Sequence, residues 1–144
     1  MDGLQIVKLS AENVGLLDNI APGVFDNDIR PDQRDAFIAN QSHHMVLAHL
    51  SGLVVGMASG FIYFHPDKDP SMVVLEVGVG DDWLRRGIGT KLMENLLEIA
   101  EEGGCEEAWL GTETDNHPAL ALYRGLDFGE ESLMTLFTYD TEPD

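Results

Sequence analysis

The sequence predicts a mixed α/β (α+β) fold with a mostly antiparallel sheet. In the first half, apolar stretches are separated by short turns, which is typical of neighbouring antiparallel strands. In the second half, apolar residues recur every three or four positions, which indicates helices. The chain has 144 residues, of which 44% are hydrophobic. That length and composition suit one folded domain with a buried core, so we expect a single domain over residues 1–144.

The first half of the chain predicts three strands and two helices. Ser10 is the expected N-cap of the first helix, and Pro31 stands where the first turn of the second helix is expected. Ser51 and Gly52 are expected to form a hairpin turn. In order, we expect a strand at 4–9, a helix at 10–20, a short helix within 26–41, and strands at 45–50 and 53–64.

The second half predicts two helices among the remaining strands. The segment 72–79 is nearly all apolar and is expected to be a central strand. Apolar residues from Ile88 onward step by three or four, and the glycine pair at 103–104 is the expected helix end. In order, we expect a turn at 65–70, a strand at 72–79, a helix at 87–103, a strand at 105–113, a helix at 117–125, and one or two strands at 128–140.

The composition restricts the possible partners. The formal net charge is −18 and the sequence pI is about 4.3, which argues against general binding of nucleic acid. Either a salt-adapted acidic surface or a cationic partner explains this charge. We expect no membrane association and a cytoplasmic location, because no apolar run has the length of a membrane span and the N-terminus lacks the pattern of a signal peptide.

The segment DDWLRRGIGTKL (81–92) concentrates positive charge in this acidic chain. A strand, then glycines, then a helix is the arrangement of an anion site, because the first turn of a helix leaves backbone N–H groups unpaired. Arg85 and Arg86 add full charges, and arginine suits phosphate oxygens. The segment is therefore either a pyrophosphate cradle or a tight glycine turn with solvated arginines. The clustering of the arginines favours the cradle.

Two common nucleotide motifs do not fit this segment. A Walker A loop needs GxxxxGK[ST], which the sequence lacks, and a dinucleotide fingerprint needs GxGxxG, of which the third glycine is missing here. A nucleotide-dependent oxidoreductase is therefore disfavoured.

Two segments together indicate a family. VLEVGVGDDWLRRGIGTKL (74–92) resembles the acetyl-CoA-binding motif of the GNAT N-acetyltransferase superfamily, although Leu84 stands where that motif has Gln or Arg. NHPALALYRGLDF (116–128) resembles the second GNAT motif, with Asp127 in place of a glycine. The resemblance implies the GNAT acyl-CoA N-acyltransferase fold, with six to seven strands and about four helices. It also implies acetyl-CoA as the acetyl donor.

The resemblance also implies roles for individual residues. Tyr123 would protonate the thiolate that leaves, and Asn116 would either contact the pantetheine arm or cap the following helix. The expected binding residues for acetyl-CoA are Val77, Gly78, Val79, Arg85, Arg86, Gly87, Ile88, Gly89, Thr90, Asn116 and Tyr123. The absent side chain of Gly78 would leave room for the ligand; alternatively, Gly78 is a glycine at a bulge in the strand.

Glu76 is the one acid in an otherwise apolar strand. A carboxylate there must be paired, solvated by a cleft, or shifted in pKa. We expect Glu76 to be the base or the anchor for the acceptor amine. The alternative is an ion pair with a neighbouring arginine, with no catalytic part.

The acceptor is expected to be a cationic amine. Acidic residues expected to form its pocket are Asp26, Asp28, Glu76, Glu113 and Asp115. A weaker resemblance to aminoglycoside 3-N-acetyltransferases suggests an aminoglycoside-like or polyamine-like small molecule. Acetylation of protein or peptide amines, and a non-catalytic acyl-CoA-binding module, remain as alternatives. By analogy with the superfamily a homodimer is possible, and we expect no metal.

Overall fold

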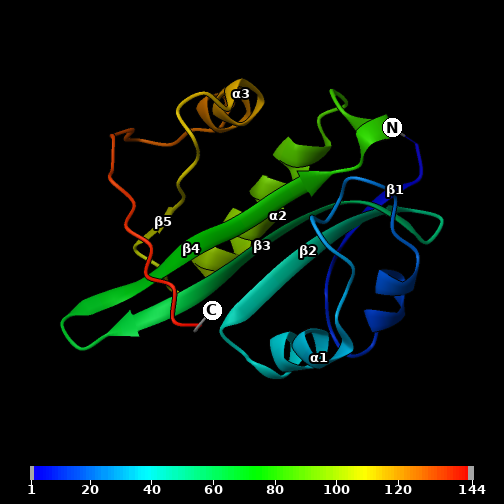
Figure 1. Cartoon of the computed structure of the whole chain (residues 1–144), viewed down its shortest axis with the longest axis horizontal. Helices are drawn as coiled ribbons and strands as arrows, with labels where there is room; N and C mark the ends of the chain where they lie inside the picture. Colours follow the sequence, from blue (N-terminus) through cyan, green and yellow to red (C-terminus); the bar gives the residue numbers. More distant parts are fainter. Residues whose placement is uncertain (1, 143–144) are drawn as a thin grey trace. The chain divides into compact units, whose positions relative to one another are not determined.

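The computed structural model describes residues 2–142, which form two compact units, one ending at Thr112 and one beginning at Glu113. The first unit is built on a five-stranded sheet with the strand order β1-β2-β3-β4-β5 (Figure 1). Its strands are β1 (Leu4–Lys8), β2 (His43–Leu50), β3 (Leu53–His65), β4 (Lys68–Val79) and β5 (Glu107–Trp109).

The pairing confirms the mixed, mostly antiparallel sheet. Strands β1 to β4 pair antiparallel in sequence order, and β5 joins β4 in parallel. Within residues 2–142 the sheet has five strands, fewer than the six to seven expected. The α-helices of this described part are α1 (Pro31–Ala39), α2 (Ile88–Glu102) and α3 (His117–Gly125), and the 3-10 helices are η1 (Val14–Asp18) and η2 (Asp81–Trp83).

The two faces of the sheet are covered differently. Helix α2 lies across β2, β3 and β4 (Figure 1), and its Leu92, Met93 and Leu96 side chains are fully buried. A Cβ at Gly56 of β3 would come within 2.9 Å of Leu92, so Gly56 faces this helix. The next residue, Met57, faces the opposite side, because side chains alternate along a strand. That second face carries the loop between η1 and α1.

Strand β4 contains a β-bulge that decides where its carboxylate points. Ser59 of β3 pairs with Glu76, whereas Gly60 pairs with Val74, so Leu75 is the extra residue. In a regular strand Glu76 would share the face of Val74, beneath α2. The bulge places Glu76 on the opposite face, beside the loop that follows η1.

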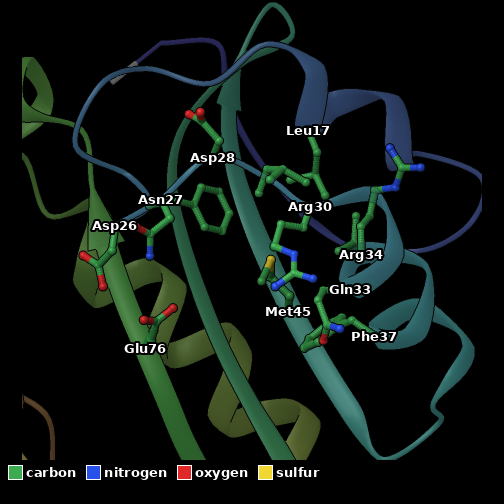
Figure 2. Close-up of a pocket in the computed structure, with 13 residues that line it drawn as sticks. Leu17, Asp26, Asn27, Asp28, Arg30, Gln33, Arg34, Phe37, Met45 and Glu76 are labelled. Carbon is green, nitrogen blue, oxygen red and sulfur yellow. The ribbon is translucent and has the colours of Figure 1, made fainter. Parts of the chain in front are cut away.

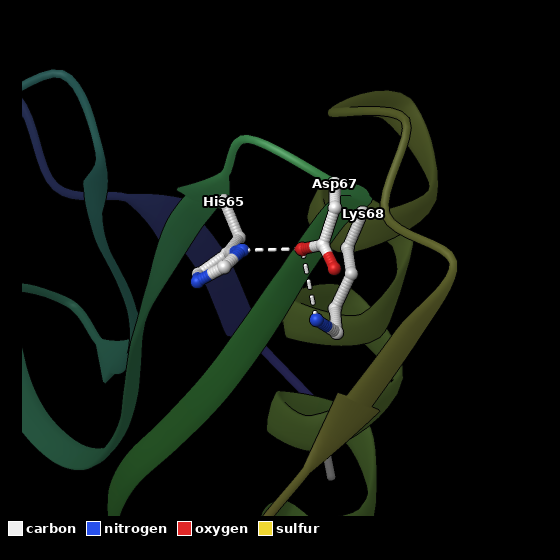
Figure 3. A network of polar contacts seen from close by, with 3 residues as sticks. All are labelled: His65, Asp67 and Lys68. Atoms are coloured by element: carbon white, nitrogen blue, oxygen red, sulfur yellow. Dashed lines mark hydrogen bonds and ion pairs between the residues drawn. The ribbon is translucent and has the colours of Figure 1, made fainter.

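The turn between β3 and β4 is shorter than predicted. His65 pairs with Lys68, so the strands extend into the expected turn at 65–70. Asp67 accepts hydrogen bonds from the His65 ring and from the Lys68 ammonium group (Figure 3). These contacts lower the pKa of Asp67, with the Lys68 hydrogen bond as the largest cause. The turn therefore remains charged and polar at neutral pH.

Two predicted elements of the first unit were too long. The helix expected at 10–20 is only the 3-10 helix η1, which begins at Val14. Ser10 lies in the turn before it, where the Ser10 hydroxyl group accepts the Glu12 N–H at 3.2 Å and the Asn13 side chain accepts the Ser10 N–H at 2.8 Å. The strand expected at 105–113 is reduced to β5, because its ladder with β4 ends at the pair Val73–Trp109.

The second unit confirms one prediction and corrects another. Helix α3 has the predicted bounds of 117–125. Arg124 near its end forms a bidentate ion pair with Glu131 at 2.9 Å. The prediction of one or two strands at 128–140 was wrong, because these residues form no backbone ladder with another strand of the described chain. Its large apolar side chains are exposed: Leu133, Met134, Leu136, Phe137 and Tyr139.

Helix α2 should dominate the stability of the first unit. Leu92→Ala leaves a cavity under the sheet, so we expect the free energy of unfolding to fall by about 2–5 kcal/mol. Urea unfolding followed by circular dichroism measures this change. Leu84→Ala is the control, since Leu84 is 55% exposed, and should change stability by less than about 0.5 kcal/mol. Equal effects of the two substitutions would contradict the packing described here.

Candidate active site

The N-terminus of α2 has the features of an anion-binding site. Arg85 and Gly87 both adopt the left-handed backbone conformation, with φ of 62° and 78°. Such a turn brings successive backbone N–H groups to one side. In the described chain this helix start has neither a side-chain cap nor an acidic residue in its first turn. By contrast, Asn116 caps α3 by accepting the Ala119 N–H at 3.2 Å.

The two arginines of the loop remain near this helix start. The Arg86 guanidinium lies over the Trp83 ring, 5.1 Å from its centroid. A cation–π contact of this kind restrains the side chain without neutralising its charge. Arg85 and Arg86 are both exposed, so their charges are accessible to an anion beside the helix.

An open strand edge lies next to this loop. The β4–β5 ladder consists of three pairs and ends at Val73–Trp109. Beyond that point β4 continues to Val79, paired with β3 alone within residues 2–142. An unpaired edge offers backbone N–H and C=O groups to an extended ligand. Val77 and Val79, predicted to contact the pantetheine arm, lie on this edge.

Gly78 has a different explanation from the one the sequence suggested. A Cβ at this position would come within 2.0 Å of the Val24 carbonyl oxygen. The glycine therefore admits the neighbouring loop, and the prediction that it leaves room for a ligand on that side was wrong. Contact between its backbone and the donor stays a prediction.

Glu76 lies at the wall of a pocket on the other face of the sheet (Figure 2). The pocket has a volume of about 300 Å³. Asp26 and Asp28 from the loop after η1 also line it, so the structure brings together three of the five predicted acceptor residues. The apolar part of its lining consists of Leu9, Leu17, Phe25, Ile29, Phe37 and Met45.

The environment of Glu76 makes it a stronger base than an ordinary glutamate. Partial burial raises the pKa of Glu76, and the negative charge of Asp26 with a hydrogen bond between the two side chains raises it further. The alternative of an ion pair between Glu76 and an arginine is not observed among the described residues. A carboxylate with a raised pKa is suited to accept a proton near neutral pH.

Some pocket residues were missed by the sequence analysis. Arg30, Gln33, Arg34 and Phe37 line the pocket across from Glu76 (Figure 2). Their spacing of three and four residues places them on one side of α1, and this periodicity was the available signal. Arg30 is paired with Asp32 at 2.9 Å and Arg34 with Asp35 at 3.0 Å.

The remaining predicted site residues belong to the second unit. Glu113 and Asp115 are exposed in the loop before α3, and Asn116 is the cap of that helix. The Tyr123 ring packs edge-on against Phe128 with centroids 6.4 Å apart. Burial raises the pKa of Tyr123, which keeps the phenol protonated at neutral pH.

Two further properties describe residues 2–142. They contain no group of three or more His, Cys, Asp or Glu side chains arranged to hold a metal ion. None of their helices combines the length and the apolar character required to cross a membrane.

Comparison with known proteins identifies the family. Residues 15–128 match the model of the Acetyltransferase (GNAT) family. This match covers most of the sequence, and the chain belongs to that family.

Curated relatives match over a shorter region. The [Ribosomal protein bS18]-alanine N-acetyltransferase of Escherichia coli (strain K12) is 33% identical over 60 residues, which are 42% of this chain and 40% of that protein. The chain thus matches less than half the length of this relative.

Solved structures share the fold over nearly the whole chain. An aminoglycoside acetyltransferase from an uncultured soil metagenomic sample, in complex with trehalose, has a TM-score of 0.85 at 19% identity, with 98% of each chain covered. AAC(6')-Iy in complex with the bisubstrate analog CoA-S-monomethyl-acetylneamine has a TM-score of 0.76 at 16% identity, covering 95% of this chain and 98% of that one. At these identities the likeness establishes the fold.

We expect the bulge at Leu75 to determine how the open edge of β4 presents its backbone hydrogen-bonding groups to coenzyme A. Deleting Leu75 makes the strand regular and leaves Glu76 on its present face, so the protein should still fold. We expect coenzyme A affinity to fall about 10-fold, the effect of losing one or two backbone hydrogen bonds of about 1 kcal/mol each. Isothermal titration calorimetry measures this affinity. Leu75→Ala keeps the bulge and is the control. Unchanged affinity in the deletion variant would refute the role of the bulge.

Proposed function

We propose that this chain is an acetyl-CoA-dependent N-acetyltransferase that acetylates a primary amine of a cationic small molecule. One observation supports this function above the others. A single strand, β4, carries a candidate base on one face, presents an open backbone edge, and leads into an uncapped helix start flanked by arginines. A donor bound along the edge would place its acyl end near the base.

The N-terminus of α2 would hold the pyrophosphate of the donor. Backbone N–H groups from Arg86 to Thr90 and the positive end of the helix dipole both favour an anion there. The guanidinium groups of Arg85 and Arg86 add charge-assisted hydrogen bonds. Acetyl-CoA supplies the activated acetyl group when it is bound.

The open edge of β4 would position the thioester. Val77 and Val79 are expected to bond to the pantetheine arm as a neighbouring strand would. A backbone N–H near Val77 or Gly78 would then donate to the thioester oxygen. A donor preorganised in this way is worth about 3 kcal/mol in the transition state.

Glu76 would accept a proton from the acceptor amine, directly or through one water molecule. The freed amine forms the new N–C bond while the C–S bond breaks, and the second proton that the amide nitrogen then loses replaces the one that Tyr123 gives to the thiolate. Tyr123 would protonate the departing thiolate, a role that its protonated phenol suits. The reaction is a direct transfer that needs no covalent enzyme intermediate.

Acidic side chains support a cationic acceptor. Asp26, Asp28 and Glu76 line the same pocket, and the chain as a whole carries a formal charge of −18. Both features attract a positively charged amine. Glu113 and Asp115 are proposed to contribute from the second unit, and an aminoglycoside or a polyamine fits this description.

A peptide or protein amine is the second candidate. The observation that favours it is the identity of 33% with the [Ribosomal protein bS18]-alanine N-acetyltransferase of Escherichia coli (strain K12). Release of free thiol from acetyl-CoA, measured against a panel of aminoglycosides, polyamines and peptides, separates the two candidates. Coenzyme A binding without thiol release for any amine would favour a non-catalytic binding module.

Gly89→Glu tests the phosphate site. The added carboxylate lies in the first turn of α2, where it blocks and repels a pyrophosphate, so we expect acetyl-CoA affinity to fall more than about 100-fold. Calorimetry provides the measurement. Asn95→Glu adds the same charge to an exposed position of the same helix and should bind normally. Retained affinity in Gly89→Glu would place the donor elsewhere.

Tyr123→Phe tests the acid. Removing the hydroxyl group leaves the ring packing intact, so we expect kcat to fall about 10–1000-fold while acetyl-CoA affinity changes little. Steady-state thiol release together with calorimetry separates these two effects. An unchanged kcat would remove Tyr123 from the proposed mechanism.

A further inference from the structure

The acceptor pocket contains a second carboxyl group whose position is linked to that of Glu76 by the backbone. Val24 and Gly78 are in contact, as the 2.0 Å approach of a Cβ at Gly78 to the Val24 carbonyl oxygen demonstrates. Asp26 follows Val24 by two residues, and Glu76 precedes Gly78 by two residues. This one backbone contact therefore brings the two carboxyl groups within reach of each other.

The loop that carries Asp26 is fastened to the sheet. The Ala21 N–H donates to the Val54 carbonyl at 2.8 Å, and the Asp81 N–H donates to the Pro22 carbonyl at 3.0 Å. Val24 itself is only 2% exposed. Asp26 thus extends from an anchored segment, and its carboxyl group has a defined place at the pocket wall.

The two carboxyl groups lie at the same wall of the pocket. Figure 2 shows Asp26 and Glu76 on the same side of the pocket, and after partial burial the charge of Asp26 and a hydrogen bond with it are the causes that raise the pKa of Glu76. The negative charge of Asp26 disfavours the ionised form of Glu76, because like charges repel. When Glu76 is protonated, it donates its proton in a hydrogen bond to the Asp26 carboxylate.

The other charged groups that line the pocket are one further carboxylate and two arginines. From the loop, Asp28 lines the same cavity. From the N-terminal end of α1, Arg30 is paired with Asp32 and Arg34 with Asp35. The strands β2 and β3 present the uncharged Met45 and Ser59 beside Glu76. Among these charged groups, Asp26 is the one whose charge raises the pKa of Glu76.

We propose that Asp26 is a positioning residue for Glu76, so that the two carboxyl groups form one unit that orients the base toward a protonated acceptor amine. This inference rests on the proposed function of the site. In the fully ionised unit, the ammonium group gives one proton to Glu76 and becomes a neutral amine. No other bond changes in this step, and the charge of Asp26 holds the transferred proton on Glu76.

This arrangement has a consequence for pH dependence. A raised pKa means that Glu76 is still protonated, and inactive as a base, at a pH where an ordinary glutamate is ionised. Asp26→Asn removes the like charge, so ionised Glu76 becomes easier to form. The acidic limb of the rate–pH profile should then move to lower pH.

The test is a nuclear magnetic resonance titration of Glu76, which needs no activity. The side-chain carboxyl carbon is followed in protein labelled at glutamate and assigned with Glu76→Gln. We expect Asp26→Asn to lower the Glu76 titration midpoint by about half a pH unit or more. Asp26→Glu restores a second carboxyl group and should return the midpoint toward that of the unmodified protein.

Asp28→Asn is the matched control, because it removes the same charge from the same loop. A Glu76 midpoint that is unchanged in Asp26→Asn, or that moves equally in Asp28→Asn, overturns the proposal. Thiol release over the same pH range is measured in parallel. If no amine is acetylated while the midpoint still moves as expected, the proposed function fails and the carboxyl pair stands.

Discussion

The β-bulge at Leu75 is the constraint on which the candidate site depends. It reverses the alternation of side chains along β4, so that Glu76 faces the acceptor pocket while Val74 and Val77 remain under α2. It also follows directly after the last pair between β4 and β5, Val73–Trp109. One extra residue thus separates the two halves of the strand, of which the first pairs with β5 and the second has an open edge within the described residues.

The site combines two kinds of electrostatic environment around a single strand. At the end of β4, the helix start and two arginines form a positive locus in a chain of net charge −18. On the opposite face, Asp26 and Glu76 make a negative wall, where partial burial and the charge of Asp26 raise the pKa of Glu76. An anionic donor and a cationic acceptor would therefore be attracted to different parts of the same strand, which suits a transfer reaction between them.

Much of the candidate site was predictable because its signals are local. The glycines and arginines of 81–92 indicated the helix start, and the isolated acid in an apolar strand singled out Glu76. The contacts across the sheet were not predictable in this way. Gly78 was assigned to a ligand, whereas the carbonyl group of Val24, distant in sequence, fills the space beside it. Arg30 and Phe37 carried only a helical spacing, which does not reveal what a helix faces.

The sequence by itself determined the family, the order of the strands and α-helices from β1 to α3, and the bounds of α3, because these follow from motifs, hydrophobic periodicity and turn residues close together in the chain. The tertiary structure decided the lengths of β5 and η1, the register of β4, and the placement of Asp26 and Glu76 in one pocket. These features depend on which backbone groups meet across long separations in sequence. The length of a strand depends on how far its neighbouring strand pairs with it, and the pKa of a carboxyl group depends on the charges around it. Residues far apart in the sequence set both properties, so a local sequence pattern does not show them.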